Sequence, residues 1–139
     1  MPDISVLIKP ASGMCNMQCK YCFYCDEIKN REVASYGFMT EETLENVIKK
    51  ALAFSDTSCS FTFQGGEPCL RGVDFFKKAV QMQKKYNTKG ISVSNAIQTN
   101  GISLDREWAG FLKENHFLAG ISLDGTSFTH DRFRVDAKG

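Results

Sequence analysis

The sequence predicts an α/β fold, a parallel sheet built from about four strand–helix units. Short segments with an apolar period of two alternate with longer segments of helical period, which is the pattern of right-handed βαβ units. A polar or glycine-containing motif follows each short segment, where βα folds place their ligand sites. A chain of 139 residues with 42% hydrophobic content makes one ordered domain, residues 1–139.

Four segments alternate in the manner of strands with one apolar and one polar face. Phe61 and Phe63 flank a threonine in the second segment, and Ile121 and Leu123 flank a serine in the fourth. Buried parallel strands are usually apolar on both faces. We therefore expect helices over the apolar face and a cavity lined by the polar face, although a solvated open face would give the same pattern. The expected strands are residues 4–9, 59–64, 91–99 and 117–123.

Three segments carry apolar residues at helical spacing. The first begins after Thr40, an N-cap residue that is followed by two glutamates favouring the positive helix end. The second covers about residues 73–86 and buries Phe76. The third starts near Asp105 and carries Trp108. No helix is expected after the fourth strand.

Composition excludes several classes of protein. A net charge of +1 lacks the excess of positive charge that is typical of proteins that bind nucleic acid or an acidic membrane. No apolar run approaches the ~18 residues that span a bilayer, and the first residues lack the basic and apolar regions of a signal peptide. Six cysteines without an export signal indicate the reducing cytoplasm, where thiols serve metals or catalysis.

The cysteine triplet Cys15, Cys19 and Cys22 is the most informative motif. Its C-x3-C-x2-C spacing places three thiols in one short loop after the first strand. A [4Fe–4S] cluster usually has four thiolate ligands, so three local ligands leave one iron open. A structural zinc site is the main alternative, since Cys25 would complete a set of four thiols. Unrelated thiols are the other alternative.

The triplet, with Tyr21 before its last cysteine, resembles the signature of radical S-adenosylmethionine (SAM) enzymes, whose open iron binds the amino and carboxylate groups of SAM. A turn after the second strand fits this resemblance. Gly65 and Gly66 permit positive φ and close backbone approach, and Glu67 offers an acceptor for the SAM ammonium group. Alone, such a turn is more often only a turn.

Polar residues after the third and fourth strands complete the candidate site. Asn100 and Ser122 offer hydrogen bonds to ribose hydroxyls or to a carboxylate, and Arg134 suits bidentate binding of the SAM carboxylate. An ordinary turn and a solvated basic segment are the structural alternatives.

Longer segments resemble those of one family of radical SAM enzymes, the anaerobic sulfatase-maturating enzymes. These segments are residues 8–24, 63–68, 97–101, 121–125 and 130–134. The resemblance implies a radical SAM oxidoreductase that converts a Cys or Ser of a sulfatase to Cα-formylglycine. Its partners would be the sulfatase polypeptide and an electron donor such as ferredoxin or flavodoxin. It also implies these roles: Cys15, Cys19 and Cys22 hold the cluster; Tyr21, Gly66, Ser122 and Arg134 contact SAM; Tyr24 and Gln64 lie near the target peptide.

Members of that family are longer than this chain. The resemblance therefore implies that residues 1–139 form the first part of a partial (β/α)6 TIM-like barrel. A SPASM-type domain with two auxiliary [4Fe–4S] clusters and the proton acceptor would lie outside, so no catalytic residue is expected here. Cys59 is expected to pack as a small apolar residue, while Cys25 and Cys69 have no assigned role. Another SPASM-type peptide-modifying enzyme and a non-catalytic zinc-binding module are the alternative functions.

Overall fold

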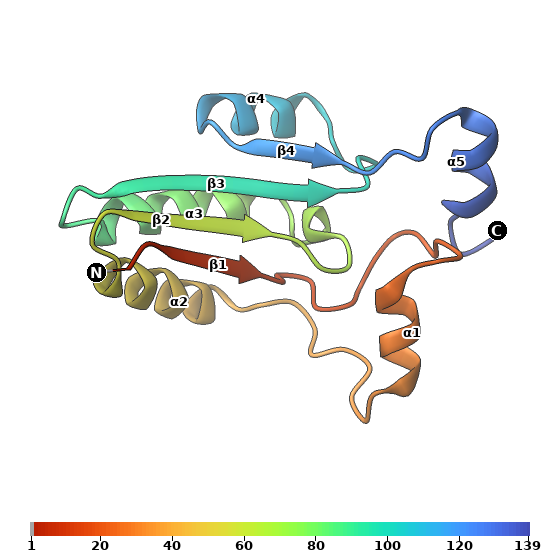
Figure 1. Cartoon of the computed structure of the whole chain (residues 1–139), viewed down its shortest axis with the longest axis horizontal. Coiled ribbons are helices and arrows are strands. Elements are labelled where there is room, and N and C mark those ends of the chain that lie inside the picture. The colour runs from red at the N-terminus through yellow and green to blue at the C-terminus, as the bar shows by residue number, and fades with distance from the viewer. Residues whose placement is uncertain (1) are drawn as a thin grey trace.

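The computed structural model describes residues 2–139 and contains the predicted parallel sheet. Its strands are β1 (Ile4–Ile8), β2 (Ser58–Phe63), β3 (Ser92–Thr99) and β4 (Leu118–Ile121). They lie side by side in chain order and are all parallel (Figure 1). All four predicted strands are confirmed, with ends shifted by at most two residues.

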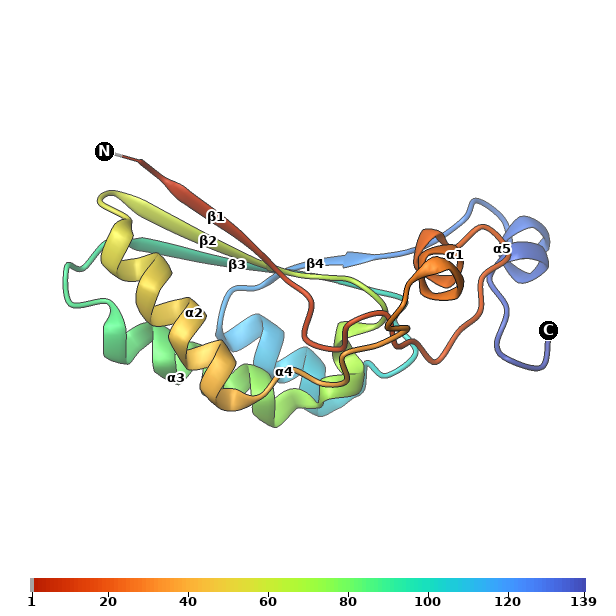
Figure 2. The same cartoon turned by 90° about the horizontal axis from the view of Figure 1, so that it is seen from below.

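Three helices cover one face of the sheet: α2 (Glu41–Phe54), α3 (Val73–Tyr86) and α4 (Arg106–Glu114) (Figure 2). The predicted N-cap of α2 is present, and α4 has an N-cap at Asp105, near its predicted start. Thr40 accepts a hydrogen bond from the Thr43 N–H at 3.1 Å, and Asp105 accepts one from the Trp108 N–H at 2.9 Å. The three predicted helices are confirmed. None of the helices between residues 2 and 139 is long and apolar enough to cross a membrane.

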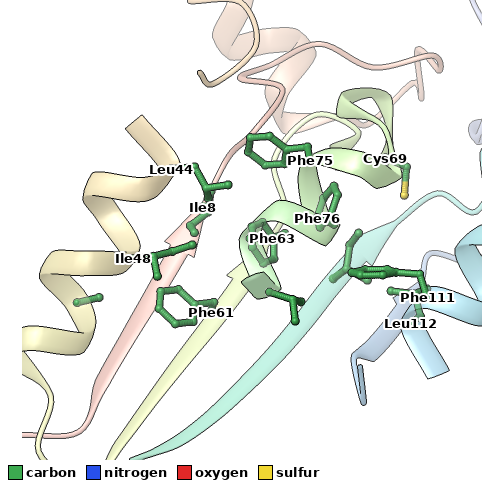
Figure 3. Close-up of a cluster of buried hydrophobic side chains, with 14 of the residues drawn as sticks. Ile8, Leu44, Ile48, Phe61, Phe63, Cys69, Phe75, Phe76, Phe111 and Leu112 are labelled. Carbon is green, nitrogen blue, oxygen red and sulfur yellow. The ribbon is translucent and has the colours of Figure 1, made fainter. Parts of the chain in front are cut away.

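Aromatic side chains fill the space between the sheet and these helices (Figure 3). The Phe76 ring lies 4.9 Å from that of Phe63 and 5.1 Å from that of Trp108, both in edge-on contact. Such pairs add about 0.5–1.5 kcal/mol to the stabilisation from burial itself. Cys59 is buried in the same cluster, as predicted.

Two α-helices were not predicted: α1 (Phe23–Asn30) and α5 (Ser127–Phe133). The expectation of no helix after the fourth strand is therefore wrong. Neither helix contains a buried residue, so neither leaves an apolar stripe in the sequence. α5 begins instead with a capping box between Thr126 and Thr129. Both helices lie beyond the carboxyl ends of the strands (Figures 1 and 2).

The second face of the sheet carries no helix among residues 2–139 (Figure 2). Small polar side chains lie on it, including Ser5 and Ser60, whose hydroxyls are 2.5 Å apart. The expectation that helices cover Ile121 and Leu123 is wrong, since these side chains are 58% and 73% exposed. The physical reason is position: β4 is the edge strand, and Ile121 is its last residue.

Candidate cofactor site

The four predicted motifs meet at one edge of the sheet, because the strands are parallel and all end there. A cavity of about 370 Å³ lies at this edge. All the residues predicted for the site line it: Cys15, Cys19, Tyr21, Cys22, Tyr24, Gln64, Gly65, Gly66, Glu67, Asn100, Ser122 and Arg134. Met17, Phe23, Gln98 and Thr99, which the sequence did not single out, complete the lining.

The cysteine loop has fixed internal geometry. The Cys22 N–H donates to the Cys19 carbonyl at 3.0 Å, and the Met17 N–H donates to Cys15 Sγ at 3.3 Å. Burial raises the pKa of the Cys15 thiol, and the Met17 N–H partly opposes this rise. The three thiols also border a second cavity of about 540 Å³, which Cys25 shares. The triplet thus separates two cavities.

Cys25 lies in the first turn of α1, three residues after Cys22 at the helix N-cap. Burial raises the pKa of the Cys25 thiol most, and its hydrogen bond with Cys22 raises this pKa further. All six cysteines are free thiols. Within residues 2–139, no three His, Cys, Asp or Glu side chains converge in a way that would hold a single metal ion.

The glycine turn packs directly against the cysteine loop. Gly65 and Gly66 have φ of +90° and +54°, and a Cβ on Gly66 would lie 2.2 Å from the Met14 carbonyl oxygen. The Glu67 N–H donates to that same oxygen at 2.7 Å. Only glycine allows this approach, so the turn and the loop form one unit.

Glu67 joins the ends of β2 and β3. Its side chain is 1% exposed, and it accepts hydrogen bonds from the Thr99 hydroxyl at 2.7 Å and from the backbone N–H groups of Asn100 and Cys69 at 2.7 and 3.0 Å. The Thr99 and Cys69 contacts could not be predicted from the sequence. Cys69 is buried, and burial raises the pKa of its thiol to about 12, so it stays protonated beside this carboxylate.

Asp124 connects two of the predicted residues. The Tyr21 hydroxyl donates to its carboxylate, and Arg134 Nε lies 3.1 Å from Asp124 Oδ2 as an ion pair. The Tyr21 hydrogen bond lowers the pKa of Asp124 most; burial opposes this shift, and the Arg134 charge lowers the pKa further. Burial and this acceptor raise the pKa of Tyr21 to about 12. Asp124 lies within the segment 121–125 that carries the family resemblance, but no role was predicted for it.

The segment after α5 crosses the cysteine loop. The Gln18 N–H donates to the Val135 carbonyl at 2.7 Å, and the Lys20 N–H donates to the Phe133 carbonyl at 2.8 Å. Arg134, between them, places Nη1 4.0 Å from Cys19 Sγ. These contacts join parts of the chain more than a hundred residues apart, and nothing in the sequence indicated them.

The remaining predicted residues line the cavity from the strand ends. Ser122 Oγ accepts a hydrogen bond from Gln98 Nε2 at 3.0 Å. The Gln64 N–H donates to the Ile8 carbonyl at 3.0 Å, which extends the strand pairing to the rim. The Tyr24 ring lies 5.0 Å from Lys9 Nζ.

The donor set fits an iron–sulfur cluster with SAM beside it. Three thiols from one loop line the same cavity, and this leaves one iron of a [4Fe–4S] cluster for another ligand. Arg134 Nε is buried and makes no aligned hydrogen bond, although its ion-pair partner is close. Beside its ion pair with Asp124, the guanidinium carries further N–H donors, which suit an anionic group such as the SAM carboxylate.

Comparison with known proteins decides the family. The sequence model of the radical SAM superfamily matches residues 10–137. The chain belongs to this superfamily. The four-stranded parallel sheet matches part of the known radical SAM fold, as predicted: a solved structure, "Native anSMEcpe with bound AdoMet", superimposes with a TM-score of 0.91 at 48% identity, over 97% of this chain and 37% of that one.

Curated relatives of this radical SAM chain include sulfatase-maturating enzymes. A "Cysteine-type anaerobic sulfatase-maturating enzyme" of Clostridium novyi is 51% identical over 99% of this chain and 37% of its own length. A "Serine-type anaerobic sulfatase-maturating enzyme" of Bacteroides thetaiotaomicron is 37% identical over 96% and 32%. The chain thus spans about a third of the length of these relatives.

Proposed function

We propose that this chain is the SAM-binding core of an anaerobic sulfatase-maturating enzyme, an oxidoreductase that converts a sulfatase Cys or Ser to Cα-formylglycine. One observation carries the proposal: every residue that the resemblance assigns to cluster, SAM or peptide lines a single cavity of about 370 Å³. The relatives support the same reaction, since both Cys-type and Ser-type enzymes match almost the whole chain.

Cys15, Cys19 and Cys22 would hold a [4Fe–4S] cluster between the two cavities. When bound, the cluster and SAM supply the 5′-deoxyadenosyl radical that removes a hydrogen from Cβ of the target residue. The protein contributes binding and orientation, since cofactors carry such chemistry.

The rim residues would bind SAM by charge and shape. The Gly65–Gly66 backbone and Glu67 would face the ammonium group, while Arg134 and Ser122 would receive the carboxylate. Asn100 and Tyr21 would contact the nucleoside, and Tyr24 and Gln64 the target peptide. The second, uncovered face of the sheet would line the reaction chamber and keep water from it.

The relatives favour cysteine as the target residue. Cys-type enzymes match at 51% and 49% identity, whereas Ser-type enzymes match at 37%, 34% and 33%. A sulfatase polypeptide would be the substrate, and a low-potential carrier such as ferredoxin or flavodoxin would deliver the electron. The free thiols suit a reducing cytoplasm. Auxiliary clusters and the proton acceptor would belong to segments outside this chain.

The decisive test removes one thiol. We expect Cys19→Ala to lose the [4Fe–4S]+ electron paramagnetic resonance (EPR) signal after anaerobic reconstitution and dithionite reduction, and to form no 5′-deoxyadenosine. The wild-type signal should change when SAM is added. Cys59→Ala, which removes a buried thiol far from the site, is the matched control and should keep both properties. Normal deoxyadenosine formation by Cys19→Ala, or zinc without iron in the wild type, would overturn the proposal.

A further inference from the structure

Asn100 contacts the cysteine loop as well as the cavity. It follows the last residue of β3, and its side-chain Nδ2 donates to Asn16 Oδ1 at 2.7 Å and lies 3.6 Å from Cys15 Sγ, within hydrogen-bond reach of sulfur. The resemblance assigns Asn100 to SAM. Its observed donors, however, are directed at a predicted cluster ligand and at the residue next to that ligand.

The orientation of this amide is fixed from its other end. Asn100 Oδ1 accepts a hydrogen bond from the Ile102 N–H at 3.0 Å, so the NH2 group faces the cysteine loop. The Asn100 backbone N–H donates to the buried Glu67 carboxylate at 2.7 Å. The side chain is therefore held in place before any cofactor binds.

Hydrogen bonds to ligand sulfurs raise the reduction potential of iron–sulfur clusters, because they stabilise the more negative reduced state. Cys15 has two such donors, the Met17 N–H at 3.3 Å and Asn100 Nδ2. We propose that Asn100 is a positioning residue that holds Cys15 and raises the reduction potential of the cluster. This inference rests on the proposed function and adds a role for Asn100 that acts through Cys15.

The test is a redox titration of the reconstituted chain, followed by EPR and performed without SAM, so that SAM binding does not contribute. Asn100→Ser keeps an acceptor for the Ile102 N–H but is too short to reach Cys15. Asn100→Asp keeps the shape and removes both N–H donors. Asn95→Ser is the control: it removes an amide from β3, the strand that Asn100 follows, where that amide pairs with Gln83 on the helix-covered face.

We expect the ratio of reduced to oxidised cluster at a fixed potential to fall about tenfold in Asn100→Ser, which is about 59 mV for a one-electron couple. This ratio should fall further in Asn100→Asp, and in Asn95→Ser it should equal that of the wild type. Failure of both Asn100 variants to take up iron, with normal uptake by Asn95→Ser, would equally support the positioning of Cys15.

Midpoint potentials of both Asn100 variants equal to that of Asn95→Ser would overturn the inference, and a loss of SAM affinity alongside would leave Asn100 as a SAM contact only. A wild-type chain that forms no iron–sulfur cluster would instead contradict the proposed function on which the inference rests. The two failures are thus distinguishable.

Discussion

The two faces of the sheet differ in how deeply their side chains are buried. Under α2, α3 and α4, aromatic and aliphatic side chains pack with almost no exposed surface. On the other face, polar side chains alternate with exposed apolar ones, such as Leu7 and Leu118 at 53% and 74% exposure. The covered face therefore supplies stability through burial, and the open face leaves surface for a ligand or further chain.

The site at the rim is held by a third kind of contact. Between Glu67, Thr99 and Asn100, and between Tyr21, Asp124 and Arg134, hydrogen bonds and an ion pair replace apolar packing. The helices beside the rim, α1 and α5, contain no buried residue, whereas α3 contains five. Polar links between strand ends thus position the site, on a framework that the covered face stabilises.

The largest expected effect concerns the covered face. Phe76→Ala removes a fully buried ring that contacts Phe63 and Trp108, and should lower the free energy of unfolding by about 3–5 kcal/mol. Leu118→Ala, on the open face, should change it by no more than about 0.5 kcal/mol. Urea denaturation measures both. Equal losses would mean that the two faces do not differ in this way.

The next effect concerns the rim. Glu67→Gln keeps the shape of the side chain but turns one acceptor into a donor that faces N–H or O–H groups. We expect a loss of about 2 kcal/mol in the free energy of unfolding. Gln98→Ala, a neighbouring change at an exposed side chain, should cost much less.

Glu67→Ala tests whether Glu67 also takes part in SAM binding. We expect weaker SAM binding with the cluster intact, because the carboxylate is lost while the cysteines remain. Isothermal titration with SAM, together with iron analysis, checks this. An unchanged SAM affinity would rule out a role for Glu67 in binding.

The smallest effect is electrostatic. In Tyr21→Phe the hydrogen bond that contributes most to the lowered pKa of Asp124 is lost, so this pKa should rise toward 3.8. The ionised Asp124 stabilises the fold above the unfolded pKa, and this contribution is lost as pH falls through the folded pKa. The variant should therefore lose less stability on acidification. Carboxyl NMR titration measures the pKa, and an identical value in both proteins would contradict this network.

The framework of the fold could be predicted from the sequence. Periods of two and 3.6 residues reflect which side chains face the core, and capping residues act within one helical turn, so the four strands and α2, α3 and α4 are encoded locally. The site residues were also predictable as a group, because parallel strands bring the motifs after them to one edge. Their individual binding roles stay predictions.

The contacts that connect this edge of the sheet could not be predicted from the sequence. α1 and α5 have no apolar stripe, and the roles of Asp124, Thr99 and the Phe133 and Val135 carbonyls depend on partners far away in the chain. A hydrogen bond between distant residues needs one donor and one acceptor and leaves no periodic trace in the sequence. Burial of one face of a strand or helix requires apolar residues at regular spacing. For this reason the core could be predicted from the sequence, whereas the hydrogen bonds and the ion pair of the site could not.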